Sequence, residues 1–352
     1  MFSNRARRSV ALIAVAGLLV AITAPPVVAG ETFWGWAVAR HPTTTSCTPA
    51  AVDQGNSQGF LNTVTRLQLG VWNVTMGDLA SQGVTHASAL STTARNCTVE
   101  DWGPLLADEV LTVDCFDRHG NRADAMFVVS YLSTAVTSGK LAYAWANDAT
   151  SPSYAPTPSN SFNSTGNVNS VQRDGTGNYR VFFPDFTQNR GTVLVSKQAF
   201  QAGSCRAVNW STQQAAMVVR VKCYDVSGVP EDSKYFISFM QGLSIKGVGG
   251  THTAYLWANH PTTASYHSDA AFRFSTAGSA STVTRSGVGR YLVDLPGMPT
   301  GGAALVTPTG NGKAHCNVSS IRFFGTPQHI GVRCFKRNGD PVDAPFALSY
   351  GR

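Results

Sequence analysis

The stretch CNVSSIRFFGTPQHIGVRCFKRNGDPVDAPFALSY, residues 316–350, decides the fold, because two earlier stretches, 97–131 and 205–239, repeat its pattern without a gap. In each copy the second cysteine follows the first by 18 positions. A glycine, an aspartate and an aromatic residue then follow the second cysteine at 5, 9 and 12 positions. Identical spacing of unlike residue types indicates one structural unit used three times. The sequence therefore predicts a tandem array.

Six of the seven cysteines lie in these blocks and form three pairs of equal spacing: Cys97 with Cys115, Cys205 with Cys223, and Cys316 with Cys334. A zinc site needs four ligands close together, and neither a Cys-x-x-Cys motif nor an accompanying histidine is present. In an oxidising compartment the pattern predicts three disulfides across β-hairpins. Cys47 is left over, at a position that holds Tyr154 and Tyr266 in the other repeats. It is interpreted either as a free thiol in a core position or as a cross-link between two chains.

The N-terminal segment 1–29 has the features of a secretory signal. It starts with basic residues, continues with an apolar run over 10–23, and ends in small residues before Gly30. This order predicts cleavage after Ala29 and a secreted, extracellular protein. Arg7 and Arg8 leave the twin-arginine route open beside ordinary secretion. No later stretch reaches the roughly 20 apolar residues that a membrane span requires.

The composition argues against several classes of partner. The formal charge of +7 falls to +4 once the leader arginines are removed, and no run of lysine or arginine concentrates it. Such a dilute charge does not indicate binding to nucleic acid or to an anionic membrane. Charged residues make up 13% of the chain and hydrophobic residues 43%, which is typical of a folded β-protein with a neutral polar surface. Motifs for nucleotides, zinc or calcium are absent from the sequence, so we expect neither a cofactor nor a metal.

Alternating apolar residues predict the fold class. Tyr291-x-Val293-x-Leu295 follows a glycine and has counterparts in the other two repeats, which is the pattern of a strand with one buried face. Each repeat holds about eight such strands and no long helical period. We predict an all-β protein of three tandem antiparallel β-sandwich domains of jelly-roll-like type, each with one disulfide. The predicted domains are 30–136, 137–247 and 248–352, with borders in glycine- and serine-rich segments.

Two further motifs carry a family resemblance. The tail Gly339-Asp340-Pro341-x-Asp343 with Phe346-x-x-Ser349-Tyr350 resembles the last two strands of the jelly rolls in complement-type globular heads and tumour necrosis factor-like domains. The motif Gly-x-Gly-x-Tyr-x-Val at 175–181 and 287–293 is similar to that of bacterial and phage-tail members of the same superfamily. The whole unit resembles tandem repeats of secreted actinobacterial proteins that generally carry no assigned function. The resemblance implies a fold and carries over no catalytic residue.

Few residues are candidates for a site. The charged positions shared by all three repeats are Arg66 and Asp124, Arg173 and Asp232, and Arg285 and Asp343. They are interpreted as ion pairs within each domain, or alternatively as a ligand-binding pair. Gly55-Asn56-Ser57-Gln58-Gly59 matches a nucleophile elbow but lacks its strand-turn-helix context. Five tryptophans are interpreted as core residues rather than as sugar platforms: Trp36, Trp102, Trp145, Trp210 and Trp257.

Three functions remain open from the sequence. We favour a secreted non-catalytic binding or adhesion protein whose loops bind a carbohydrate, a cell wall or a protein. The alternatives are a structural extracellular component that self-assembles, and a hydrolase or hydrolase inhibitor. Homo-oligomers are compatible with each of these. Linker glycines such as Gly247 and Gly249 favour an extended string of domains over a compact internal trimer, although the linkers are long enough for both.

Overall fold

The computed structural model describes residues 32–133, 139–247, 251–322, 325 and 327–352, and almost all regular structure in it is β. The expected leader 1–29 and the expected first domain border lie outside these residues, and the second border adjoins the undescribed residues 248–250. Within the described residues each repeat contributes nine strands, close to the eight expected. They form two antiparallel sheets packed face to face, so the three β-sandwich domains are present.

In each domain one sheet has four strands and lies toward the other domains, and the other has five. In domain 1 the four-stranded sheet has the order β6 (Val84–Leu90), β9 (Met126–Ser133), β1 (Phe33–Ala39) and β3 (Gln54–Asn56). The five-stranded sheet has the order β7 (Asn96–Leu105), β8 (Asp108–Phe116), β5 (Val71–Met76), β4 (Asn62–Gln68) and β2 (Ser46–Cys47).

Domains 2 and 3 repeat this order. In domain 2 the four-stranded sheet has the order β15 (Thr192–Gln198), β18 (Lys234–Gln241), β10 (Lys140–Ala146) and β12 (Ser161–Asn163). Its five-stranded sheet has the order β16 (Gly203–Gln213), β17 (Ala216–Asp225), β14 (Asn178–Pro184), β13 (Ser170–Gly175) and β11 (Ser153–Tyr154). In domain 3 the four-stranded sheet has the order β24 (Ala303–Pro308), β27 (Phe346–Gly351), β19 (Thr253–Ala258) and β21 (Arg273–Ser275). Its five-stranded sheet has the order β25 (His315–Ile321), β26 (Gln328–Phe335), β23 (Arg290–Leu295), β22 (Thr282–Gly287) and β20 (Ser265–His267). Single 3₁₀ turns at Pro158–Asn160 and Ala270–Phe272 complete the elements.

The burial pattern follows the sequence. In β23, Tyr291, Val293 and Leu295 are buried while Arg290 and Leu292 face solvent, as the alternation predicted. The strand β6 behaves differently, because every one of its residues is buried. A strand buried on both faces must be covered from a second side, and in this protein the neighbouring domains supply that cover.

The three predicted disulfides are present, and each joins the two strands of one hairpin. The half-cystines face each other in register, with Cα–Cα distances of 4.1, 4.0 and 4.0 Å for the first, second and third bridge. These spacings are those of the narrow, non-hydrogen-bonded antiparallel pair rather than those of the wider, hydrogen-bonded pair, which is about 5.5 Å. Each disulfide fixes the register of the hairpin whose first strand lies next to the neighbouring domain.

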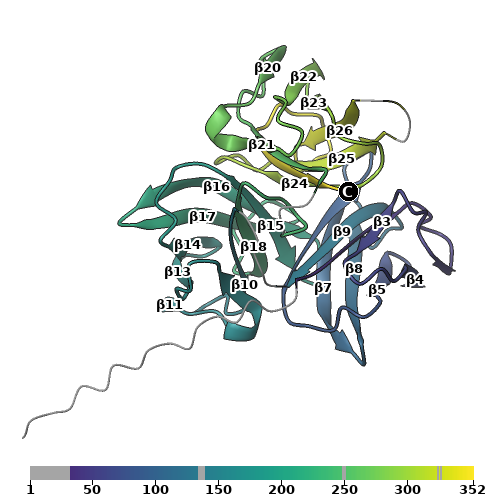
Figure 1. The fold of residues 1–352 in the computed structure, drawn as a ribbon, viewed down its shortest axis with the longest axis horizontal. Coiled ribbons are helices and arrows are strands. Elements are labelled where there is room, and N and C mark those ends of the chain that lie inside the picture. The colour runs from purple at the N-terminus through teal and green to yellow at the C-terminus, as the bar shows by residue number, and fades with distance from the viewer. Residues whose placement is uncertain (1–31, 134–138, 248–250, 323–324, 326) are drawn as a thin grey trace, which may run out of the picture.

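The three sandwiches pack around a common pseudo-three-fold axis, so the expected extended string is wrong (Figure 1). Each domain places the edge strand of its four-stranded sheet beside the cysteine strand of the next domain, which closes a ring. The parallel bridges join Gln198 to Val99, Val318 to Leu90, and Ala207 to Thr309. Linker composition predicted mobility, but the sheet edges decide the packing because their backbone groups need partners.

Three equivalent hydroxyl residues, here called the hydroxyl triangle, satisfy those edges at the axis. Each one binds both the backbone N–H and the backbone carbonyl of a residue in the neighbouring domain. The pairs are Ser88 with Val306 (3.0 and 3.3 Å), Ser196 with Ala87 (3.2 and 3.5 Å), and Thr307 with Val195 (2.9 and 3.3 Å). The hydroxyl triangle therefore links all three domains in one cycle.

A second equivalent set of side chains donates hydrogen bonds across the same borders. Thr98 binds the carbonyl of Ala199 at 2.8 Å, and Asn317 binds that of Thr93 at 2.8 Å. Arg206 occupies the matching position in domain 2, where it is buried and donates to the carbonyls of domain 3 residues 312 and 314. Burial lowers the pKa of Arg206 to about 10, which leaves it charged at neutral pH.

Tryptophans seal two of the three domain borders. Trp102 of domain 1 packs edge-on against Trp145 of domain 2, with ring centroids 4.6 Å apart, and Trp210 of domain 2 packs against Trp257 of domain 3 at 4.8 Å. Trp36 lies in the core of domain 1. Four of the five tryptophans thus occupy interfaces between domains, a location that a core interpretation of single domains did not foresee. None of these four forms an open sugar platform, because each ring packs against another aromatic ring.

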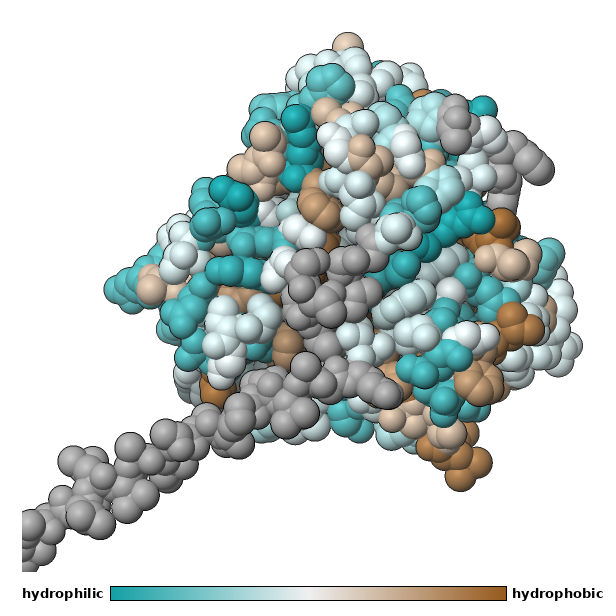
Figure 2. All heavy atoms as spheres, in the orientation of Figure 1, coloured by the Kyte–Doolittle hydropathy of each residue, from teal (hydrophilic) through white to brown (hydrophobic). Residues whose placement is uncertain are grey.

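The face of the molecule in the view of Figure 2 is mainly polar. On the face shown in Figure 2 hydrophilic residues dominate, and hydrophobic residues gather chiefly at the lower right over domain 1. The exposed large side chains of this domain include Phe60, Leu61, Leu105 and Leu106, which come from two adjacent turns. Single exposed apolar residues are normal on protein surfaces.

Candidate functional site

In each domain the shared arginine forms an ion pair with the shared aspartate of the same domain. The guanidinium of Arg66 binds both carboxylate oxygens of Asp124, and the same arrangement recurs for Arg173 with Asp232 and Arg285 with Asp343. The closest ion-pair distances are 2.9, 2.7 and 2.8 Å respectively. The N–H of a turn glycine adds a further bond to each carboxylate: Gly70, Gly177 or Gly289.

These clamps close a turn rather than present a site. The hydrogen bonds from Arg173 lower the pKa of Asp232, despite partial burial of the carboxylate, so the pair is ionised at neutral pH. Tyr179 also donates to this carboxylate at 3.1 Å. A carboxylate with this many donors has little capacity left for a ligand. The arrangement therefore matches the intradomain interpretation.

The other candidates lie apart from one another. Ser57 accepts a hydrogen bond from the backbone N–H of Trp34 at 3.1 Å, and its segment forms β3 and a turn rather than a strand-turn-helix elbow. Cys47 is unpaired and half-buried on the edge strand β2, where burial raises the pKa of its thiol. Among the described residues, no group of three histidine, cysteine, aspartate or glutamate side chains could hold a metal ion.

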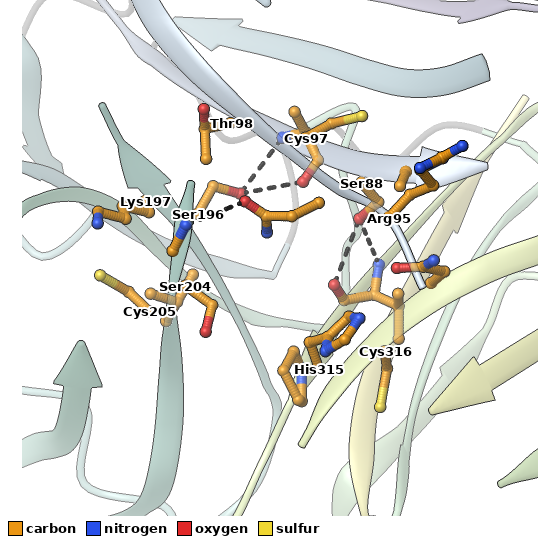
Figure 3. A pocket seen from close by; sticks show the side chains of 18 residues that line it. Ser88, Arg95, Cys97, Thr98, Ser196, Lys197, Ser204, Cys205, His315 and Cys316 are labelled. Atoms are coloured by element: carbon orange, nitrogen blue, oxygen red, sulfur yellow. Dashed lines mark hydrogen bonds between the residues drawn. The ribbon is translucent and has the colours of Figure 1, made fainter. Parts of the chain in front are cut away.

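The three domains enclose a small polar cavity at the disulfide end of the axis (Figure 3). Its volume is about 40 Å³, and Cys97, Cys205 and Cys316 each contribute one wall. The hydroxyls of Ser88 and Ser196 line it with the buried ammonium group of Lys197. Lys197 is already paired with Glu231 at 2.6 Å. This space suits one or two waters rather than an organic ligand.

A larger cleft lies beside this cavity, between domains 1 and 3, and is here called the basic cleft. Its volume is about 480 Å³, which falls within the range of small-molecule sites, roughly 300 to 1,000 Å³. Three arginines line it: Arg95 before β7, Arg118 in the turn after β8, and Arg333 on β26. They face a single carboxylate, Asp117.

Hydrogen bonds to the ring of His119 and to two backbone carbonyls position two of these arginines. Arg118 donates to His119 at 2.9 Å and to the carbonyl of Asn338 in domain 3 at 3.4 Å, while Arg333 donates to the carbonyl of Thr92 in domain 1 at 2.9 Å. Within the described part of the chain none of the three guanidinium groups forms an ion pair, and Arg95 has no hydrogen-bond partner. Asp117 is occupied by the backbone N–H groups of His119 and Asn121, at 2.8 and 2.9 Å.

Glycine permits the close approach of the two domains here. Gly339 has φ +88°, and a Cβ atom at this position would lie 3.1 Å from Cδ of Arg118. A side chain would therefore be strained and would displace the arginine from the cleft. The shared turn glycine thus has a structural role in every repeat and, in domain 3, also shapes the basic cleft.

Neither of the two equivalent borders carries all three cations: the border of domains 2 and 3 keeps two of them, and the border of domains 1 and 2 keeps none. By repeat alignment, Arg95, Arg118 and Arg333 correspond to Gly203, Val226 and Asp114 at the border of domains 1 and 2. They correspond to Ala314, Arg337 and Lys222 at the border of domains 2 and 3. Scaffold positions persist among these repeats, whereas the full set of three arginines occurs at one border only. Such local divergence is typical of binding positions.

Sequence reasoning missed the basic cleft, because its arginines lie far apart in the chain and come from two repeats. The hydroxyl triangle did have a signal, namely a serine or threonine at the same position of an apolar strand in all three copies. His86 had another signal, since the other repeats place Leu194 and Leu305 there. The histidine is buried between domains 1 and 2, and its ring nitrogens lie 3.2 and 2.7 Å from the hydroxyls of Ser196 and Ser238.

Comparisons with known proteins add no assignment. No protein-family model, curated protein or solved structure matches this chain. In the described residues, none of the helices has the length and apolar character needed to cross a membrane.

Proposed function

We propose that this protein is a secreted, non-catalytic binding or adhesion protein whose main ligand site is the basic cleft. The observation that carries the proposal is the convergence of three arginines, none of them in an ion pair with a described residue, in a cleft large enough for a small ligand. A folded protein usually pairs or exposes its cations, and uncompensated charge gathered in a concave site favours an anionic partner. The predicted leader and the disulfides support an extracellular location.

A cell-wall and glycan pull-down tests the proposal. We expect at least one extracellular polymer to retain the oxidised protein. In a separate, broad hydrolase screen we expect no turnover. Absence of retention on glycans, cell walls and extracellular proteins alike would contradict it. A dose-dependent hydrolase activity lost on Ser57→Ala substitution would favour the enzyme alternative instead.

The second candidate function is a structural extracellular component. The observation in its favour is the free, half-buried Cys47 on β2, a two-residue strand at the edge of a sheet. Edge strands and odd cysteines both offer routes to association between chains. Electrophoresis without reductant tests this: a disulfide-linked dimer that disappears in Cys47→Ser would support it, and a purely monomeric protein would remove the cross-linked form.

A further inference from the structure

We propose that the basic cleft binds an oxyanion group, such as sulfate, phosphate or carboxylate, carried on a ligand of saccharide size. This inference rests on the proposed binding function and specifies the chemistry of the ligand. Arginine is suited to the role, because its planar fork of N–H donors matches the geometry of carboxylate and phosphate oxygens.

The first supporting observation is the charge of the cleft. Three arginines face one aspartate, Asp117, whose Oδ1 already accepts two backbone N–H groups. The carbonyls that position Arg118 and Arg333 orient their guanidinium groups without neutralising them. The remaining N–H donors of these side chains stay available for an anion.

The second observation is a like-charge pair on the adjoining strands. Arg290 of β23 lies directly opposite Arg333 of β26 in the antiparallel register. Like charges in this arrangement destabilise a sheet. The corresponding pair in domain 1 is Val71 opposite Asp114, so the fold itself does not require two arginines. Arg333 lines the basic cleft and Arg290 lies beside it on the neighbouring strand, so an anion bound to Arg333 would offset part of the repulsion.

The third observation concerns size. The axial cavity of about 40 Å³ excludes anything larger than water or a small ion, whereas the basic cleft of about 480 Å³ is open to a larger group. Threonine side chains at positions 92 and 93 line the same cleft. Hydroxyls, backbone carbonyls and arginines together suit an acidic sugar better than an apolar molecule.

The test uses substitutions that the sister repeats already contain. Arg95→Ala reproduces Ala314, and Arg118→Val reproduces Val226, so both are compatible with the repeat fold. The control is Arg190→Ala, which removes the same charge from an exposed position before β15, at the opposite end of that strand from the disulfides. Intact disulfides and an unchanged melting temperature establish that each variant is folded.

Binding is measured by calorimetry against four probes: inorganic sulfate, a sulfated heparin oligosaccharide, an oligogalacturonate and neutral dextran. We expect one of the two acidic oligosaccharides to bind the wild-type protein, with an affinity that falls in high salt. Each arginine substitution should weaken this binding roughly tenfold, the size of one charge-assisted hydrogen bond, and Arg190→Ala should leave it unchanged. Arg118→Lys should recover part of the loss, because it restores charge without the fork.

Several results would overturn the inference. These are no binding of either acidic oligosaccharide, equal binding of dextran, equal affinity in the Arg95→Ala/Arg118→Val variant, or an equal loss in the control. Binding of sulfate alone would refute the saccharide-sized ligand. The cell-wall pull-down separates the two proposals: retention of the double variant at wild-type level would keep the binding function while rejecting this site. The opposite result is that the double variant loses its affinity for the acidic oligosaccharide while cell walls retain neither the variant nor the wild type. That result would keep the site and reject the cell wall as the target.

Discussion

Removal of the hydroxyl triangle is predicted to loosen all three domain borders at once. The variant is Ser88→Ala, Ser196→Ala and Thr307→Val. Each substitution leaves one backbone N–H without its partner, at bond lengths of 3.0, 3.2 and 2.9 Å in the native protein. A buried donor left unsatisfied costs about 1 to 3 kcal/mol, so the triple variant should lose about 3 to 9 kcal/mol of unfolding free energy. This loss is large against the unfolding free energy of about 5–15 kcal/mol that is typical of a folded protein.

Urea unfolding of the oxidised protein, followed by circular dichroism, measures the loss. Ser265→Ala is the matched control, because that serine is exposed and its hydroxyl lies 3.3 Å from Thr284 within the same domain. The control should change the unfolding free energy by less than about 0.5 kcal/mol. A triple variant that lies within this margin of the wild type, or that matches the control, would refute the role of the hydroxyl triangle.

Three other perturbations follow from buried side chains. Burial lowers the pKa of His86 to about 3, so the unfolded chain protonates first as pH falls below about 6.5, and the unfolding free energy should drop by about 1.4 kcal/mol per pH unit. In unfolding curves measured over a pH series, His86→Leu should flatten this part of the pH dependence. An unchanged slope would contradict the assignment to His86. Burial of its carboxylate raises the pKa of Glu109 to about 8. The unfolded chain therefore ionises first above about pH 4.5, and Glu109→Met should stabilise the protein between pH 5 and 8 by up to about 1.4 kcal/mol per unit, with no pH-dependent gain below pH 4; a gain independent of pH would refute this cause. Trp210→Ala should cost about 3 to 5 kcal/mol in the same unfolding assay, and a cost below about 1 kcal/mol would show that the tryptophan pair does not hold the border.

Much of each single domain could be predicted from the sequence. The cysteine spacing and the alternation around Tyr291 depend on local strand geometry, which a periodic pattern records directly. The assembly could not be predicted in the same way. Its contacts join residues such as Ser88 and Val306, which lie 218 positions apart, and linker composition says nothing about such pairs. The complete burial of β6 is the physical reason for the compact form, because a string would expose that strand.

The candidate site was predictable only in part. The arginines of the clamps recur in every repeat, so a comparison of repeats finds them and suggests the pairing within each domain that the structure contains. A different comparison finds the arginines of the basic cleft. It looks for positions whose charge differs from one repeat to another, and Arg95, Arg118 and Arg333 are among them. Two repeats must be brought together before these residues form a cleft, and only the ring of domains does so.

Small-angle scattering of the oxidised, leader-free protein tests the ring of domains most directly. A compact chain of roughly 320 residues has a radius of gyration of about 20 Å, whereas three such domains in a row give about 30 Å. We predict the smaller value, with a distance distribution that has a single maximum. A radius near 30 Å with an elongated profile would contradict the ring, and with it the basic cleft between domains 1 and 3.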